Sequence, residues 1–177
     1  DILYTFGSTS KVTFPGAGVA ALGTSKNNIS YLKKVMGIRT IGYDKINQLR
    51  HVRFFGTYEG ILEHMEKHRA ILKPKFDAVI DMLEKEIAPL GIGSWTNPDG
   101  GYFISFDSLP GCAKRIVELC KEAGVTLTGA GATYPYGKDP EDKNIRIAPT
   151  YPSVDELTMA MEIFCLAVKI ASAEKVL

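Results

Sequence analysis

Residues 7–18, with the sequence GSTSKVTFPGAG, place a single lysine among hydroxyl-bearing residues and glycines. Lys11 comes shortly after the apolar run at residues 2–6, and α/β sheets place their ligand crevices where strands end. A partly desolvated amine there can act as a nucleophile. The alternative is a solvated lysine in a turn. The segment is not a phosphate-binding P-loop, because Ser10 and Val12 stand where that motif needs a glycine and a hydroxyl residue.

Arg146 is a second candidate for chemistry. It lies in the otherwise apolar run Ile145, Arg146, Ile147 and Ala148. A guanidinium group binds a carboxylate through two parallel hydrogen bonds, so an arginine held on a strand suits an acidic ligand. The alternative is an exposed strand face that points Arg146 at water.

The histidines and cysteines indicate no metal site. His64 and His68 are four residues apart in a helical pattern, but Met65 stands where the motif H-E-x-x-H has its glutamate. We therefore expect both histidines on a solvated helix face. The three cysteines are an odd number without a C-x-x-C pair, which indicates neither a disulfide framework nor a zinc site.

The composition is that of an ordinary soluble globular protein. The chain has 177 residues, of which 45% are hydrophobic and 23% are charged. Its formal net charge of +1 gives no electrostatic reason to expect a nucleic acid or an acidic membrane as a partner. No apolar stretch approaches the ~20 residues that span a bilayer, and no leader opens the chain, so we expect a cytoplasmic location.

Hydrophobic periodicity and turn residues predict alternating strands and helices. Strands are expected near residues 2–6, 19–23, 92–96, 102–106, 125–128 and 145–147. Helices are expected near residues 25–36, 44–54, 57–87, 111–123 and from 153 onward. Gly37 and Gly56 should end the first two helices, and Pro74 should kink or divide the third.

Side-chain caps mark several of these helix starts. Ser25 and Asp44 are suited to cap the first two helices. Ser153 and Glu156 form the capping-box pattern of the last helix. Its expected buried stripe consists of Leu157, Met161, Phe164 and Val168.

This order of elements predicts an α/β protein with a mixed first part and a second part that forms a small α+β layer. Two strands with their helices cannot make a doubly wound sheet that is covered on both faces. We therefore expect that the first part pairs with another chain, or that the sequence is the C-terminal portion of a longer protein whose sheet begins before Asp1.

Four motifs, taken in order, resemble one family. They are S-x-S-K followed by P-G, then N-P-D-G-G-Y-F, G-A-G-A-T-Y and N-I-R-I-A. Together they resemble the C-terminal half of the pyridoxal-phosphate aminotransferases of fold type I, and STSKVTFPGAGVAAL is most similar to the bacterial aspartate aminotransferase subgroup. The resemblance implies that residues 1–70 are the end of a large, mixed-sheet, cofactor-binding domain and that residues 71–177 are a small C-terminal domain. It also implies a homodimer.

The resemblance also implies roles for single residues. Lys11 would hold pyridoxal 5'-phosphate covalently and carry the proton that leaves the substrate α-carbon. Ser8 matches the position at which the family contacts the cofactor's phosphate, and Ser10 is a candidate for a second contact. Arg146 would bind the α-carboxylate of the substrate. The implied reaction is transamination between an amino acid, such as aspartate or another dicarboxylic one, and a 2-oxo acid.

The sequence departs from the family at the phosphate. In most relatives an arginine that grips the phosphate follows the P-G by two or three residues, where this chain has Gly18 and Val19. Other groups must then hold the phosphate, such as Arg39 or an arginine before Asp1. The aspartate and the aromatic ring that the family uses to hold the cofactor ring would also lie before Asp1.

A second class of function stays open. Some transcriptional regulators carry an aminotransferase-like effector domain that binds the cofactor without turnover. The sequence upstream of Asp1 separates the two classes, because a winged-helix module and linker would indicate the regulator.

Overall fold

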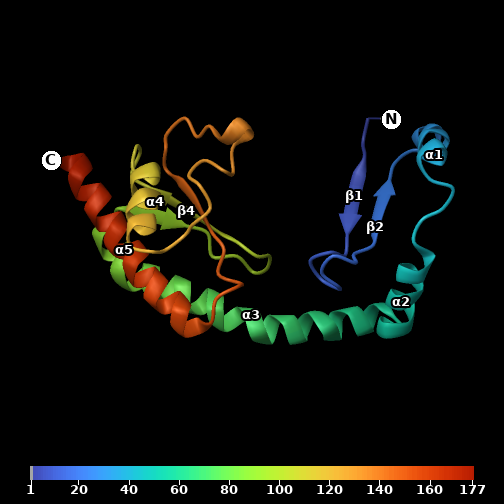
Figure 1. Ribbon diagram of the computed structural model, residues 1–177, viewed down its shortest axis with the longest axis horizontal. Coiled ribbons are helices and arrows are strands. Elements are labelled where there is room, and N and C mark those ends of the chain that lie inside the picture. Colours follow the sequence, from blue (N-terminus) through green and yellow to red (C-terminus); the bar gives the residue numbers. More distant parts are fainter. Residues whose placement is uncertain (1) are drawn as a thin grey trace. The chain divides into compact units, whose positions relative to one another are not determined.

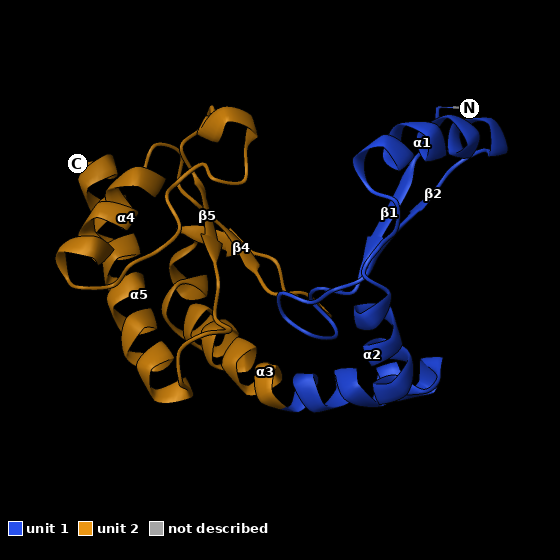
Figure 2. Cartoon of the chain, turned by 45° about the vertical axis from the view of Figure 1, so that its right-hand side comes forward, with its two compact units in different colours: residues 1–70 blue, residues 71–177 orange. Residues whose placement is uncertain are grey.

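The computed structural model describes residues 2–177, and the chain forms two compact units, Asp1–Ala70 and Ile71–Leu177 (Figure 2). The elements in chain order are β1 (Thr5–Ser8), β2 (Ala20–Gly23), α1 (Lys26–Arg39), α2 (Lys45–Phe55), α3 (Tyr58–Glu86), β3 (Gly93–Trp95), β4 (Ile104–Ser108), α4 (Ala113–Glu122), β5 (Asn144–Ile147) and α5 (Val154–Val176) (Figure 1). Short 3-10 turns lie at Ala88–Leu90 and Pro135–Gly137.

In the first unit, β1 and β2 form a two-stranded antiparallel sheet whose register pairs Thr5 with Gly23 and Ser8 with Ala20. The strand expected at residues 2–6 therefore begins later. The register explains the shift, because β2 ends at Gly23, opposite Thr5, and leaves residues 2–4 without a described strand to pair with. Beyond that point the Thr24 hydroxyl donates a hydrogen bond of 2.7 Å to the carbonyl oxygen of Leu3.

The caps predicted for α1 and α2 are confirmed. The Ser25 hydroxyl accepts from the backbone of Asn28, and the Asp44 carboxylate accepts from the backbone of Asn47. Gly56, at φ 68°, ends α2 as expected. Gly37 does not end α1, which continues to Arg39. A glycine inside a helix costs only about 1 kcal/mol, which the hydrogen bonds of the following turn offset.

Of the two effects expected of Pro74, a kink or a division of the third helix, the division does not occur, because α3 is one continuous helix. Proline removes one backbone hydrogen bond and crowds the preceding turn. In the turns that follow Pro74, the side chains of Val79 and Leu83 are fully buried in the core of the second unit. This burial stabilises the helical path beyond the proline.

The second unit is built around the antiparallel sheet β3-β4-β5. Alternate residues of β4 and β5 face a core that α3, α4 and α5 also line. The central ring is Phe106, which is fully buried and lies edge-on to Phe164 of α5 at a centroid distance of 5.1 Å. The strand expected at residues 102–106 is displaced to Ile104–Ser108, because β4 pairs with β5 only from Ile104 and with β3 only from Phe106.

Residues 125–128 do not form the expected strand. Their apolar members, Val125 and Leu127, pack against the core as half-buried side chains. The backbone amide of Val125 donates instead to the carbonyl oxygen of Cys120 and closes the end of α4. The apolar pattern here reflects packing against the core and not strand pairing.

The last helix follows the sequence prediction closely. Ser153 and Glu156 form the capping box, and the predicted stripe Leu157, Met161, Phe164 and Val168 is buried. Cys112, Cys120 and Cys165 are free and buried. Burial raises the pKa of Cys120 to about 11 and that of Cys165 to about 12, so both thiols remain protonated at neutral pH and pack as small apolar groups.

Gly93→Ala should destabilise the second unit. A Cβ atom at residue 93 would lie 2.6 Å from Cζ and 2.9 Å from Cε2 of the buried Phe106 ring, which has no open space to move into. Overpacking of this kind lowers the free energy of unfolding by about 1–3 kcal/mol. Urea unfolding, followed through the fluorescence of Trp95, measures the loss. The exposed neighbour Ser94→Ala is the control, and an equal midpoint for both variants would contradict the packing assigned to Phe106.

Candidate functional site

The loop between β1 and β2 carries Lys11. Thr9 closes this loop, because its amide donates to the carbonyl oxygen of Val19 at 2.8 Å and its hydroxyl accepts from the Val19 amide at 2.8 Å. The carbonyl oxygen of Thr9 accepts from the amides of Val12 and Thr13, both at 2.9 Å. Lys11 therefore lies inside a single hydrogen-bonded turn and has an exposed side chain.

The two hydroxyls predicted to contact a phosphate meet beside this turn. Ser8 Oγ and Ser10 Oγ are 2.9 Å apart, and the backbone amide of Ser10 donates to Ser8 Oγ at 3.2 Å. Both residues are exposed. The structure thus places Ser8, Ser10 and Lys11 on one short, structured stretch of backbone.

Gly18 passes very close to this stretch. A Cβ atom at residue 18 would lie 2.7 Å from both Cα and Cβ of Ser10 and 2.8 Å from its amide nitrogen. No side chain fits there without moving Ser10. Of the two positions at which most relatives of the resembled family have the phosphate-gripping arginine, residue 18 is therefore closed by the path of this backbone, and residue 19 is a valine. Arg39, the substitute considered from the sequence, lies in the last turn of α1 and is exposed.

Two side chains on one face of α2 form hydrogen bonds with this loop. Asn47 Nδ2 donates to the carbonyl oxygen of Ala17 at 2.7 Å. One turn later, His51 Nε2 lies 2.9 Å from the hydroxyl of Thr13, which is only 2% exposed. Neither Asn47 nor His51 was expected at the site from the sequence. Their spacing of four residues was the available signal, but nothing in the sequence shows which surface that helix face meets.

An aromatic cluster continues this contact along α2. The ring of Phe14 lies edge-on to His51 and to Phe54, both at a centroid distance of 5.1 Å, and 5.4 Å from Phe55. The expectation that His64 lies on a solvated face is wrong. Its ring packs 5.2 Å from Phe55, and its Nε2 atom is buried with no hydrogen-bond partner among residues 2–177.

His68 lies beside His64, with ring centroids 4.4 Å apart. No group of three or more histidine, cysteine or acidic residues among residues 2–177 is arranged to hold a metal ion. Within the same range, none of the helices combines the length and apolar character that crossing a bilayer requires.

Arg146 lies on β5, opposite Ser105 of β4 and on the face of the sheet that points away from the core. It is half-buried, and its Cζ atom lies 4.4 Å from the ring centroid of Phe103. Its Nε atom is buried without a hydrogen-bond partner among residues 2–177. Stacking on an aromatic face orients the plane of a guanidinium group. The arrangement differs from the exposed strand face considered as the alternative.

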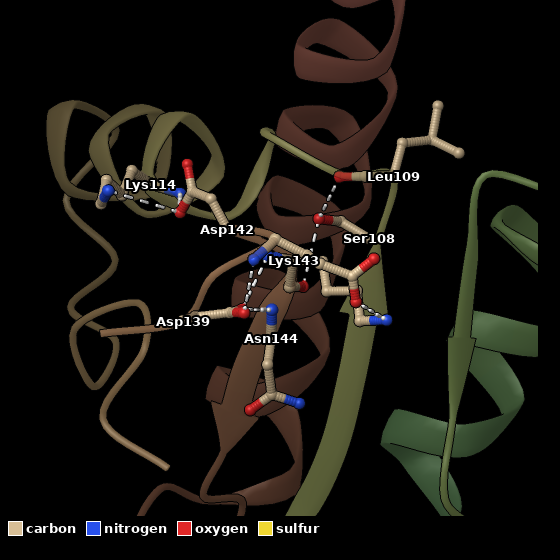
Figure 3. A network of polar contacts seen from close by, with 8 residues as sticks. Ser108, Leu109, Lys114, Asp139, Asp142, Lys143 and Asn144 are labelled. Atoms are coloured by element: carbon tan, nitrogen blue, oxygen red, sulfur yellow. Dashed lines mark hydrogen bonds and ion pairs between the residues drawn. The ribbon is translucent and has the colours of Figure 1, made fainter. Parts of the chain in front are cut away.

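Asn144 braces the same face two residues earlier. Its Nδ2 atom donates to Ser105 Oγ at 2.9 Å and to Asp107 Oδ1 at 2.7 Å, and its Oδ1 atom accepts from the Thr133 hydroxyl. The backbone amide of Asn144 donates to Asp139 (Figure 3). This network ties the loop before β5 to the neighbouring strand and fixes the register on which the position of Arg146 depends.

Asp139 organises that loop as a hydrogen-bond acceptor. Its carboxylate accepts from the backbone amides of Glu141, Lys143 and Asn144 (Figure 3). Burial of the carboxyl group opposes ionisation, but these hydrogen bonds together outweigh it and lower the pKa of Asp139. The charged form that holds the loop is therefore present at neutral pH. Asp139 was not expected at the site from the sequence, although an Asp-Pro pair is a turn signal.

Comparison with known proteins gives close matches over nearly the whole chain. Residues 1–177 match the family described as "Aspartate amino-transferase". An aspartate aminotransferase of Corynebacterium glutamicum is 50% identical over 97% of this chain and 40% of its own length. The crystal structure of an aspartate transaminase from Corynebacterium glutamicum has a TM-score of 0.95 at 49% identity and covers 97% of this chain and 41% of that one.

More distant proteins share the fold. The crystal structure of an α-aminoadipate aminotransferase from Thermus thermophilus, complexed with N-(5'-phosphopyridoxyl)-L-leucine, has a TM-score of 0.77 at 20% identity, with coverage of 96% of this chain and 42% of that one. The chain therefore spans about two fifths of the length of the proteins it matches.

Gly18→Ala should loosen the Lys11 loop. The added methyl group would collide with the backbone of Ser10, so either the turn or the Thr9 and Val19 pairing must shift. We expect a loss of about 1–3 kcal/mol in the free energy of unfolding and faster hydrogen exchange of the Val19 amide. Gly37→Ala is the control, because a Cβ atom there meets nothing within 4 Å. Unchanged exchange at Val19 would show that the passage of Gly18 past Ser10 is not tight.

Proposed function

Because the chain belongs to the aspartate amino-transferase family, we propose that the protein it forms catalyses pyridoxal-phosphate-dependent transamination between an amino acid and a 2-oxo acid. The observation that carries the proposal is the short loop that presents Lys11 beside the paired hydroxyls of Ser8 and Ser10. The fold is α/β and corresponds to the C-terminal portion of a fold type I aminotransferase. Since the chain spans about 40% of its relatives, the activity proposed is that of the whole protein.

The residues of the loop fit the chemistry of the cofactor. Pyridoxal phosphate needs one primary amine for covalent attachment, and its phosphate needs hydroxyl and N–H donors. Lys11 supplies an exposed amine, and Ser8 and Ser10 supply two exposed hydroxyls. Gly18, which lacks a side chain, lets a second stretch of backbone approach Ser10 closely. When bound, the cofactor supplies an electron sink for the charge that develops at the substrate α-carbon.

Lys11 has two roles in this proposal. Its Nζ atom would attach the cofactor. After the substrate amine has replaced it, the same amine would take the proton from the substrate α-carbon and pass it to the cofactor's C4′ carbon. An amine that acts twice must stay in place between the two steps. The turn closed by Thr9 and Thr13 supports this, because it fixes the backbone on both sides of Lys11.

Arg146 binds the α-carboxylate of the substrate in this proposal. The stacking on Phe103 and the bracing of β5 by Asn144 support it, because a guanidinium group whose plane is already set loses less entropy when it pairs with a carboxylate. The half-buried position also strengthens the pairing relative to water.

The proposed donor is aspartate or another dicarboxylic amino acid. The support is the identity of 50% to a protein named aspartate aminotransferase. The regulator considered from the sequence is less favoured, because the matched proteins are named aminotransferases. The proposal also assigns residues 1–70 to a large cofactor-binding domain and residues 71–177 to a small domain, in agreement with the two compact units. We also propose that the whole protein is a homodimer located in the cytoplasm.

Lys11→Ala in the full-length protein should abolish transamination while the protein still folds, because an exposed loop lysine contributes little to packing. Wild-type protein mixed with excess aspartate or glutamate should convert the cofactor's absorption band to that of its amino form and release the matching 2-oxo acid. The variant should do neither. Borohydride reduction of the wild type should fix the pyridoxyl group to the peptide that contains Lys11.

Lys45→Ala, an exposed lysine at the start of α2, is the matched control and should keep full activity. If Lys11 is modified by borohydride but a dozen common amino acids leave the absorption band unconverted, the non-catalytic regulator becomes the better account.

Arg146→Lys should weaken the use of every amino-acid substrate. Lysine keeps the charge but loses the two-pronged geometry, so transition-state stabilisation should fall by about 2–4 kcal/mol, or roughly 30-fold to 1000-fold in kcat/KM. Steady-state kinetics measures this loss. The control is Arg115→Lys, a surface arginine that pairs with Glu174. Equal kcat/KM for Arg146→Lys and wild type would remove Arg146 from the substrate site.

A further inference from the structure

We propose that His51 is a positioning residue that holds Lys11 in its working place through Thr13. The proposal rests on the function assigned to Lys11 above. His51 acts from the neighbouring helix α2 on the turn in which Lys11 lies.

The hydrogen bonds of the His51 ring determine how it meets the loop. Nδ1 lies 2.9 Å from the carbonyl oxygen of Asn47, and Nε2 lies 2.9 Å from Thr13 Oγ1. A carbonyl oxygen can only accept, so Nδ1 carries the hydrogen. In the neutral ring Nε2 is then an acceptor, and the single hydrogen of the Thr13 hydroxyl is shared between His51 Nε2 and the carbonyl oxygen of Thr9.

Thr13 passes this contact to the turn around Lys11. Its hydroxyl also lies 3.0 Å from the carbonyl oxygen and 3.0 Å from the hydroxyl of Thr9. Thr9 Oγ1 in turn accepts from the Val19 amide and lies 3.5 Å from His51 Nε2. A shift of Thr13 therefore moves both ends of the turn from Thr9 to Thr13 that contains Lys11.

Burial makes the contact with His51 specific. Thr13 is 2% exposed, so water has little access to replace a missing partner of its hydroxyl. The edge of the Phe14 ring packs on His51 at 5.1 Å, and Phe55 lies 5.8 Å from it, so the imidazole ring cannot easily turn away. The ring contacts fix the orientation of the imidazole, and the hydrogen bond between Nε2 and Thr13 links the imidazole to the loop.

Three variants of the full-length protein separate these contributions. His51→Phe keeps the aromatic packing and removes the acceptor. His51→Gln places an amide where Nε2 lies and can restore the hydrogen bond. Thr13→Val removes the hydroxyl from the other side with almost no change of volume. Circular dichroism confirms folding, and Thr13→Val carries the test if His51→Phe fails to fold.

His51→Phe should lower kcat by about 10-fold to 100-fold, the cost of a misplaced catalytic group, while KM for the amino acid changes little. Thr13→Val should lower kcat by at least as much, and the double variant should be no worse than Thr13→Val alone, because both changes remove the hydrogen bond between His51 and Thr13. His51→Gln should recover most of kcat. The rate at which pyridoxal phosphate becomes reducible onto Lys11 should follow the same order.

The exchange rate of the Val19 amide, measured in cofactor-free protein, tests the loop independently of activity. It should rise about 10-fold in His51→Phe and Thr13→Val and return toward wild type in His51→Gln. Equal exchange and equal kcat in wild type and His51→Phe would overturn the proposal, and so would a His51→Gln variant as impaired as His51→Phe. If wild-type protein neither attaches the cofactor nor transaminates, the proposed function fails, but the Val19 exchange still decides the role of His51.

Discussion

The backbone of the first unit crosses itself where Gly18 passes Ser10, and the contact is so close that no side chain could occupy residue 18. This crossing constrains the whole loop. It brings the return strand back to Thr9, whose amide and hydroxyl pair with Val19 and close the turn that contains Lys11. It also leaves the hydroxyls of Ser8 and Ser10 together on the open side. The same geometry that shapes this site thus excludes an arginine side chain at residue 18.

The two proposed functional residues are held by different physical means. Lys11 sits in a turn whose shape comes from hydrogen bonds of the loop and from the side chains of Asn47 and His51 on α2. Arg146 is placed by sheet register, with its neighbours Ile145 and Ile147 anchored in the core. A one-residue slip would turn Arg146 into that core, so burial of those isoleucines specifies its direction strongly.

The two units differ in how much apolar surface they bury. The second unit holds nearly the whole described core, from Val79 to Ala171. In the first unit, Phe6, Ile38 and Ile41 are largely exposed, and the buried contacts gather around Phe55 and Thr13. Our proposal that the first unit is part of a larger domain accounts for this difference, because a larger domain could cover those side chains.

Local chemistry in the sequence was enough for the α/β class, for the helix caps at Ser25, Asp44 and Ser153, and for the buried stripe of α5, because each depends on residues a few positions apart. It was also enough to single out Lys11 and Arg146. Tertiary structure decided the rest. The packing of distant elements keeps α3 continuous through Pro74 and leaves residues 125–128 outside the sheet. It also buries His64 against an aromatic ring and brings His51 to Thr13, 38 positions away in the chain. Such contacts follow from how elements pack, and no pattern of neighbouring residues encodes which faces will meet.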